Sequence, residues 1–224
     1  MRIVVYGNII ENNQTNFSTN FNHQIYSTFL NNINIETAKR LHKKGREGRF
    51  KRLFTFSTLY IKDSNVHFYV AGEDSLIKDF ISNIIKNQII NIDNIIINVT
   101  KIDQLENLKE KESYKFKTDF IVNKRQNGLK GKACLSKDFD YIKERINQIA
   151  KDKYKDIYGE DIEENINVKF LDCKKVYTTY KNFHLNSYKA KVQLSGSFKL
   201  INLIYQVGLG ENTSSGHGFC WEMV

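Results

Sequence analysis

The sequence has no proline and only three cysteines among its 224 residues. The cysteines, Cys134, Cys173 and Cys220, are odd in number, lack Cys-x-x-Cys spacing and lie among apolar residues. They therefore predict core positions in a reducing compartment rather than a disulfide framework or a metal site. The absence of proline beside many Ile, Asn and Lys residues fits an AT-rich genome, and we draw no function from it.

The sequence also lacks a long apolar run. Its start, Met1–Gly7, is too short for a secretory hydrophobic region, and no later stretch is long enough to span a bilayer. We therefore expect a soluble cytoplasmic protein without a membrane partner. A chain of this length can form one large domain or two small ones, and can bury about 70 % of its unfolded surface without disulfides.

Acidic residues are in deficit, with 25 against 34 basic residues and a net charge of +9. Most of the excess falls between Lys39 and Arg52, where Glu47 is the only acid. The basic residues there are Lys39, Arg40, Lys43, Lys44, Arg46, Arg49, Lys51 and Arg52. Together with Gly45 and Gly48 they predict a loop that binds a polyanion, although a solvated charged face is the alternative.

His42 lies in this basic segment. With Asn34 as N-cap and Gly45 after the end, it falls in the last turn of an expected helix. The helix dipole favours the imidazolium there, while the neighbouring cations oppose it. His42 is therefore a candidate for general acid–base chemistry.

A glycine-dense segment near the C-terminus, Gly208–Phe219, is the second candidate site. We call it the glycine-rich loop. Glycine leaves backbone N–H groups unshielded, so we expect the loop to bind phosphate. No lysine and no following helix are present, which argues against a nucleotide-triphosphate or dinucleotide loop. The residues expected to bind are Gly208, Gly210, Ser214, Ser215, Gly216, His217 and Gly218.

Hydrophobic periodicity predicts an α+β protein of two tandem ferredoxin-like, RRM-like domains. In the first half we expect strands at 2–9, 53–61, 66–71 and 89–100 and helices at 24–31, 35–44 and from Asp74 or Ser75. In the second half we expect strands at 114–122, 166–171, 176–180, 188–194 and 219–224, and helices from Asp138 and Ser197. The order β-α-β-β-α-β predicts domains at 1–105 and 112–224, joined by a charged linker.

Three segments resemble one known family, the CRISPR-associated endoribonucleases that cut precursor CRISPR RNA within its repeats. This is the sixth numbered Cas family of the RAMP superfamily. The glycine-rich loop is similar to the family's G-hydrophobic-G signature, repeated after a five-residue spacer. Phe21-Asn22-His23-Gln24 with Tyr26 looks like its first-helix opening. Leu41-His42, the basic loop and Leu53–Ser57 look like its catalytic histidine and the strand after it.

The resemblance implies metal-independent cleavage by the ribose 2′-OH, leaving a 2′,3′-cyclic phosphate and a 5′-OH and producing guide crRNA. It assigns His42 as acid or base and gives Arg52, Lys51 and Arg49 the role of stabilising charge. It also implies that no cofactor is needed. The second catalytic group stays open, because Tyr26 lies one turn before the family's tyrosine. Arg52 stands where some members carry a lysine, and arginine cannot serve as an acid. Lys43, Lys44, Arg46 and Arg49 are expected to bind RNA.

The resemblance also leaves the role of several residues open. The spacer of the glycine-rich loop contains Glu211 and no basic residue, and His217 replaces a hydrophobic residue. His23 and His67 are expected to be structural and sheet-surface residues, and His184 has no assigned role. Phe54, Phe56 and Tyr60 are expected in the core rather than stacked on RNA.

Two other functions remain open, a non-catalytic RNA-binding subunit of a CRISPR ribonucleoprotein and a general single-strand nucleic-acid module. The expected partners are CRISPR repeat RNA and, as further candidates, other Cas proteins of a surveillance complex. The protein itself is expected to be a monomer or homodimer.

Overall fold

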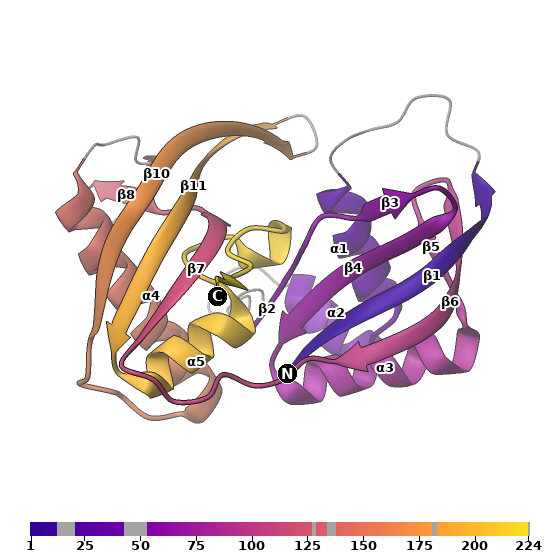
Figure 1. The fold of residues 1–224 in the computed structure, drawn as a ribbon, viewed down its shortest axis with the longest axis horizontal. Coiled ribbons are helices and arrows are strands. Elements are labelled where there is room, and N and C mark those ends of the chain that lie inside the picture. Colours follow the sequence, from indigo (N-terminus) through magenta and orange to yellow (C-terminus); the bar gives the residue numbers. More distant parts are fainter. Residues whose placement is uncertain (13–20, 43–52, 127–128, 134–137, 181–182, 224) are drawn as a thin grey trace.

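The fold is taken from a computed structural model of the full chain. It describes residues 1–12, 21–42, 53–126, 129–133, 138–180 and 183–223. The chain forms two α+β halves that lie side by side, each with an antiparallel sheet in front and helices behind it (Figure 1). Each half has its own hydrophobic core, one built from residues 3–97 and the other from residues 108–220.

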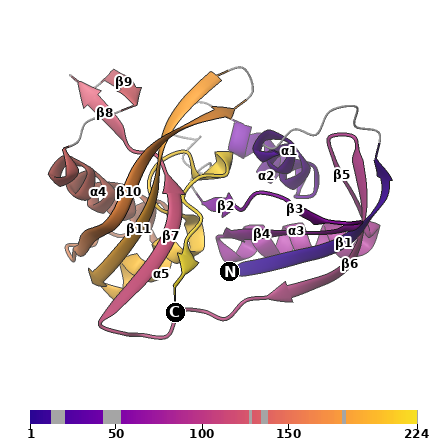
Figure 2. The same ribbon diagram turned by 45° about the horizontal axis from the view of Figure 1, so that its top comes forward.

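The sheet of the first half contains β1 (Arg2–Asn12), β2 (Phe54–Phe56), β3 (Tyr60–Lys62), β4 (Asn65–Gly72), β5 (Ile89–Ile92) and β6 (Ile95–Gln104). Its strand order is β2-β4-β1-β6-β5, with β3 also pairing β4, and every pairing is antiparallel. The helices α1 (Asn22–Asn31), α2 (Ile35–His42) and α3 (Asp74–Asn87) cover one face (Figure 2). Within the described residues, the other face carries no helix.

Apolar spacing and capping explain the helices of this half. The inward face of α3 is fully apolar and buries Leu76, Ile77, Phe80 and Ile84. The Glu73 carboxylate caps α3 by accepting hydrogen bonds from the N–H groups of Ser75 and Leu76, at 2.9 and 3.1 Å. The expected cap at Asp74 or Ser75 is therefore wrong, because the longer Glu73 side chain reaches the free donors first. Among the described helices, none is long and apolar enough to cross a bilayer.

The second half repeats the topology of the first. Its sheet contains β7 (Ser113–Phe120), β10 (Ile166–Tyr180), β11 (Phe183–Gly196) and β12 (Trp221–Glu222), in the order β10-β11-β7-β12. The helices α4 (Phe139–Tyr158) and α5 (Phe198–Val207) pack behind it, and the short turn η2 (Thr213–Ser215) lies within the glycine-rich loop. Both halves therefore follow the predicted ferredoxin-like order of elements.

Five of the predicted strands differ from the structure. The strand expected at 53–61 breaks into β2 and β3, and the one expected at 89–100 is the hairpin β5–β6, which turns at Asp93 with φ 61°. The strands expected at 166–171 and 176–180 are one strand, β10, because the ladder continues through a register shift between Phe170 and Asp172. The last strand, expected at 219–224, is only β12.

One pair of strands was not predicted at all. A small hairpin, β8 (Asn123–Gln126) and β9 (Leu129–Ala133), stands outside the main sheet. Its residues are mostly polar, so no alternating apolar pattern marked it.

Candidate functional site

A cleft of about 980 Å³ opens between the two halves. The start of α1, residues 56–58 and Tyr60 line it from the first half, and β7, β10 and β11 line it from the second half. Residues of the glycine-rich loop and of β12 complete its walls. The cleft therefore brings together segments that lie far apart in the sequence, including parts of all three that carry the family resemblance.

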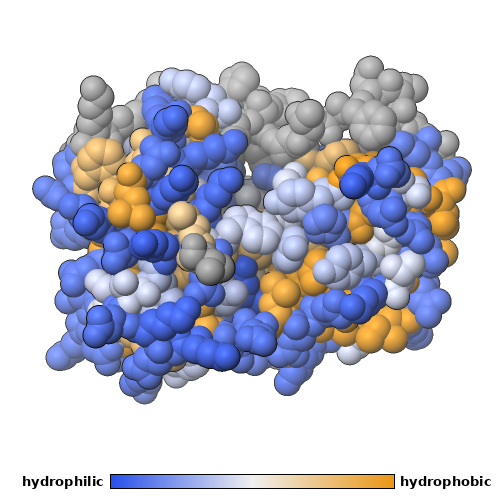
Figure 3. Space-filling view, in the orientation of Figure 1, coloured by the Kyte–Doolittle hydropathy of each residue, from blue (hydrophilic) through white to orange (hydrophobic). Residues whose placement is uncertain are grey.

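Four exposed lysines line the cleft from the second sheet: Lys117, Lys174, Lys189 and Lys191. They sit opposite one another across the ladder, Lys191 against Lys117 and Lys174 against Lys189. Two aspartates line the same wall, with Asp119 opposite Lys189 and Asp172 opposite Lys191, so the wall keeps a net positive charge that a polyanion can neutralise. Hydrophilic side chains predominate on this face of the second half (Figure 3).

The backbone amides of the glycine-rich loop are largely committed within the protein. Three of them donate to backbone carbonyls, those of Gly208, Gly216 and Gly218 to the oxygens of Ile204, Thr213 and Asp119, respectively. These three N–H groups already have acceptors and have no second proton to donate, so RNA binding by these residues stays a prediction that their amides do not support.

Close packing explains why the loop is rich in glycine. At Gly218, with φ 79°, an added Cβ would lie 2.2 Å from the carbonyl oxygen of Leu209. At Gly216, with φ 80°, it would lie 2.6 Å from the side chain of Asn22, the first residue of α1. The loop thus fastens the second half against the first. Of its predicted RNA-binding residues, Gly216 and His217 line the cleft, while Gly208, Gly210, Ser214 and Gly218 are buried away from it.

His217 and Asp119 form a polar pair at the wall of the cleft. The His217 Nδ1 and Asp119 Oδ1 atoms lie 3.5 Å apart, and the His217 side chain is only 2 % exposed. The Thr55 hydroxyl fixes the backbone beside the ring by donating to the His217 carbonyl at 2.8 Å. In the described part of the chain neither Nδ1 nor Oδ1 has a hydrogen-bond partner. Buried polar atoms of this kind are candidates to bind a polar group in the cleft.

Glu211, the acid in the glycine-rich loop, is neutralised by an internal ion pair. Its carboxylate lies 2.9 Å from Nη2 of Arg145 on α4, and both side chains are almost buried, at 12 % and 10 % exposed. Asn123 also donates to Glu211. The negative charge of Glu211, which departs from the family pattern, is therefore paired within the protein and does not face the cleft as a free anion.

The predicted catalytic residues are described only in part. His42 ends α2, but its side chain lies outside the described residues, as do Lys43, Lys44, Arg46, Arg49, Lys51 and Arg52. Tyr26 is partly buried on α1 and stacks on Phe54 with ring centroids 6.1 Å apart. Through Asn22, the start of α1 lies beside the cleft. The catalytic role of His42 and the contribution of the basic loop stay predictions.

Other predicted positions are settled by burial. Phe54 and Phe56 are fully buried as expected, whereas Tyr60 is 39 % exposed, so its expected core position is wrong. Cys220 is buried and Cys173 is partly buried against the same core, while Cys134 lies outside the described residues. The cleft lysines were missed, although Lys189 and Lys191 have the spacing of residues on one face of a strand.

Comparisons with known proteins agree with this architecture. The C-terminal family model of CRISPR associated protein Cas6 matches residues 102–222. No curated protein matches the sequence. Three solved structures share the fold over the whole chain. A "CRISPR associated protein Cas6" has a TM-score of 0.79 and 21 % identity, covering 100 % of this chain and 99 % of its own. "An RAMP protein binding different RNA substrates" has a TM-score of 0.82 and 18 % identity, with 100 % of both chains covered. A "Cas6 product complex" has a TM-score of 0.70 and 14 % identity, again with 100 % of both chains covered.

Proposed function

The chain belongs to the Cas6 family of CRISPR-associated proteins, and we propose that it is an endoribonuclease that cuts CRISPR precursor RNA within its repeats. The single observation that carries this proposal is the cleft, where a lysine-lined sheet faces the start of α1 and the glycine-rich loop. Two structures with the same fold are described as an RNA-binding RAMP protein and a Cas6 product complex, which supports RNA as the substrate.

The cleft suits the backbone of RNA rather than a small metabolite. Its lysines are spread over β7, β10 and β11, so they can meet successive phosphates along a strand. The exposed Thr58 hydroxyl lines the opposite wall and can donate to a phosphate or ribose oxygen, whereas the Ser57 hydroxyl already donates to the Thr58 carbonyl at 2.8 Å. Net positive charge on one wall and a neutral donor on the other favour a strand that enters with its phosphates toward the second sheet.

For the chemical step we propose metal-independent cleavage by the ribose 2′-OH. A base removes the 2′-OH proton, the oxygen attacks the adjacent phosphorus, and an acid protonates the departing 5′-oxygen. This leaves a 2′,3′-cyclic phosphate and a 5′-OH. His42, at the end of α2, is the proposed acid or base, and Arg52, Lys51 and Arg49 are proposed to stabilise the charged phosphorane. Tyr26 is the tyrosine that we propose as a candidate for the second group.

The test is cleavage of the cognate repeat RNA in EDTA by wild type and by His42→Ala. His184→Ala, a histidine near the tip of the β10–β11 hairpin, is the matched control. We expect wild type and His184→Ala to cut at one position, and His42→Ala to bind but cut at least roughly a hundredfold more slowly. Binding without cleavage by wild type would leave only an RNA-binding subunit. Normal cleavage by His42→Ala would move the site elsewhere.

A further inference from the structure

The open face of the first sheet carries a connected group of aromatic rings. Tyr6 on β1, His67 on β4 and Tyr60 on β3 lie side by side across three strands, in register with one another. Tyr69 follows His67 on the same face of β4, and Trp221 of β12 closes the group from the second half. We call these five residues the aromatic face.

The rings of the aromatic face contact one another closely. Tyr60 stacks on His67 with centroids 4.9 Å apart and an angle of 10°, and Tyr6 lies 6.0 Å from His67. Tyr69 meets the edge of Trp221 at 4.6 Å. The contacts hold the rings in fixed positions, so little further entropy would be lost when a flat ligand packs on them.

These rings are outside the hydrophobic core. Along β4 the side chains alternate, and Val66, Phe68 and Val70 are buried under the helices while His67 and Tyr69 remain partly exposed. The hydroxyls of Tyr6, Tyr60 and Tyr69 have no hydrogen-bond partner within the described residues. Burial raises the pKa of Tyr60, and burial followed by the neighbouring Tyr6 and Tyr60 raises the pKa of Tyr69. The phenols of Tyr60 and Tyr69 are therefore neutral at physiological pH.

Positive charge borders the aromatic face where it meets the cleft. Trp221 pairs with Lys117, and Tyr60 and Trp221 themselves line the cleft. At the opposite end Lys101 of β6 lies against Tyr6, with its Nζ 5.9 Å from the ring centroid, but its charge is paired with Asp103 at 2.7 Å. Rings that adjoin the cleft lysines favour a ligand with flat bases and a phosphate backbone over an apolar protein surface.

We propose that the aromatic face binds an unpaired stretch of the RNA by stacking two or three bases on its rings, while the cleft lysines hold the adjoining phosphates. The proposal rests on the proposed function in that the strand is the repeat RNA. It adds a binding site on the face of the first sheet that bears no helix, away from the expected catalytic histidine. Stacking on aromatic residues of an open sheet is an effective way to bind single strands.

Trp221 allows a direct test because it is the only tryptophan in the chain. A 12-nucleotide oligoadenylate RNA is titrated against the full protein while Trp221 fluorescence is followed, and inorganic polyphosphate serves as a polyanion without bases. We expect the RNA to quench Trp221 and polyphosphate to leave it almost unchanged. Equal responses to both ligands, or no response to saturating RNA, would overturn the proposal.

Three substitutions at two positions separate stacking from folding. Tyr60→Ala removes a ring that is 39 % exposed, and Tyr60→Phe keeps the ring while removing only the hydroxyl. We expect RNA affinity to fall roughly tenfold in Tyr60→Ala and to stay within about twofold in Tyr60→Phe. His67→Ala, which removes the next ring of the stack, is expected to behave like Tyr60→Ala. Wild-type affinity in both alanine variants would overturn the proposal, provided their thermal unfolding is unchanged.

The outcome can be read separately from catalysis. Quenching and ring-dependent affinity in a protein that never cuts repeat RNA would keep the aromatic face and remove the endoribonuclease. Cleavage of repeat RNA by a protein whose RNA affinity is unchanged by Tyr60→Ala and His67→Ala would keep the endoribonuclease and remove the aromatic face.

Discussion

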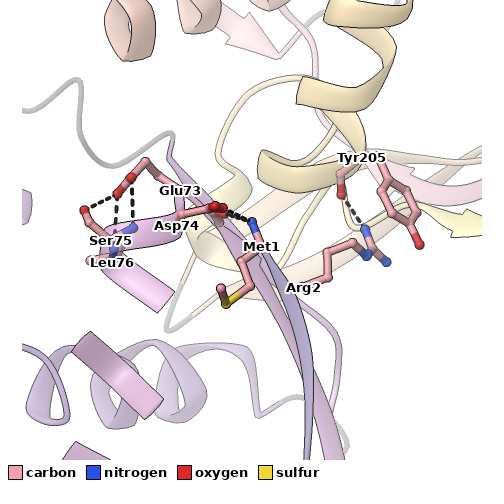
Figure 4. A network of polar contacts seen from close by, with 8 residues as sticks. Met1, Arg2, Glu73, Asp74, Ser75, Leu76 and Tyr205 are labelled. Carbon is pink, nitrogen blue, oxygen red and sulfur yellow. Dashed lines mark hydrogen bonds and ion pairs between the residues drawn. The ribbon is translucent and has the colours of Figure 1, made fainter. Parts of the chain in front are cut away.

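The guanidinium of Arg2 lies on the ring of Tyr205, with its Cζ atom 3.7 Å from the ring centroid (Figure 4). Arg2 begins β1 in the first half and Tyr205 lies on α5 in the second half. Arg2 also donates to the backbone carbonyls of Tyr205 and of Cys220, the latter at 2.9 Å, and its other ring contact is with Phe219. One buried cation, 4 % exposed, thus joins the two halves behind the cleft.

Arg2→Met should loosen this junction. Methionine keeps the length of the side chain but leaves two buried carbonyls without their donor, and each such loss costs about 1–3 kcal/mol. We expect the free energy of unfolding to fall by about 3 kcal/mol in urea denaturation. Arg40→Met, at an exposed position of α2, is the control and should change it by less than about 0.5 kcal/mol. Equal stability of the two variants would show that Arg2 does not join the halves.

The Glu211–Arg145 pair should behave as a coupled buried ion pair. Glu211→Gln alone leaves Arg145 nearly buried without its counter-charge, which we expect to cost about 3 kcal/mol. Adding Arg145→Met should recover much of this loss, because no unpaired charge then remains. The two single variants and the double variant together give the coupling energy by thermal or urea unfolding. Additive losses would contradict a direct pair.

Lys189→Gln and Lys191→Gln should weaken RNA binding in a salt-dependent way. If each lysine meets one phosphate, each substitution should reduce the slope of log affinity against log salt concentration by roughly 0.7. Lys78→Gln, on the exposed side of α3, is the matched control and should leave the slope unchanged. The slopes are measured by fluorescence anisotropy of labelled repeat RNA between about 50 and 200 mM salt. A slope that responds equally to all three variants would place the RNA outside the cleft.

The thiol of Cys220 should make stability depend on pH above neutrality. Burial raises the pKa of Cys220 to about 11, against about 8.5 in an unfolded chain. Folding thus favours the protonated thiol, so its contribution is complete below about pH 8.5 and is lost as the pH rises toward 11. The stability advantage of wild type over Cys220→Ala should shrink by about 1.4 kcal/mol per pH unit in this window. Urea denaturation at pH 8, 9.5 and 10.5 tests this, and a constant difference would contradict it.

Much of the fold follows from local pattern in the sequence. The apolar spacing of α3, α4 and α5 and the order of strands in each half were enough to predict two ferredoxin-like units. The break in the strand expected at 89–100 was missed although Asp93-Asn94 interrupts the β-branched run, and Asp93 turns the β5–β6 hairpin with a positive φ. Asp and Asn tolerate a positive φ, so this pair was a turn signal that needed no glycine.

The candidate site was harder to predict because it depends on contacts between distant segments. The glycines of the loop were read as phosphate ligands, but they are required by packing against Asn22, Leu209 and Ile121, which no local pattern reveals. Tyr60 alternates with Phe54 and Phe56 in sequence, yet the break between β2 and β3 places it on the open face of the sheet. Periodicity predicts which residues share a face only while the strand is continuous.

The most direct test of the proposed chemistry is cleavage of a repeat RNA that carries a single 2′-deoxy nucleotide immediately 5′ of the scissile phosphate. The modified RNA should bind with the affinity of the unmodified repeat and resist cleavage completely, because the attacking oxygen is missing. The unmodified RNA, in EDTA, should give a 2′,3′-cyclic phosphate and a 5′-OH. Cleavage of the 2′-deoxy RNA at the same position and rate would contradict the proposed mechanism.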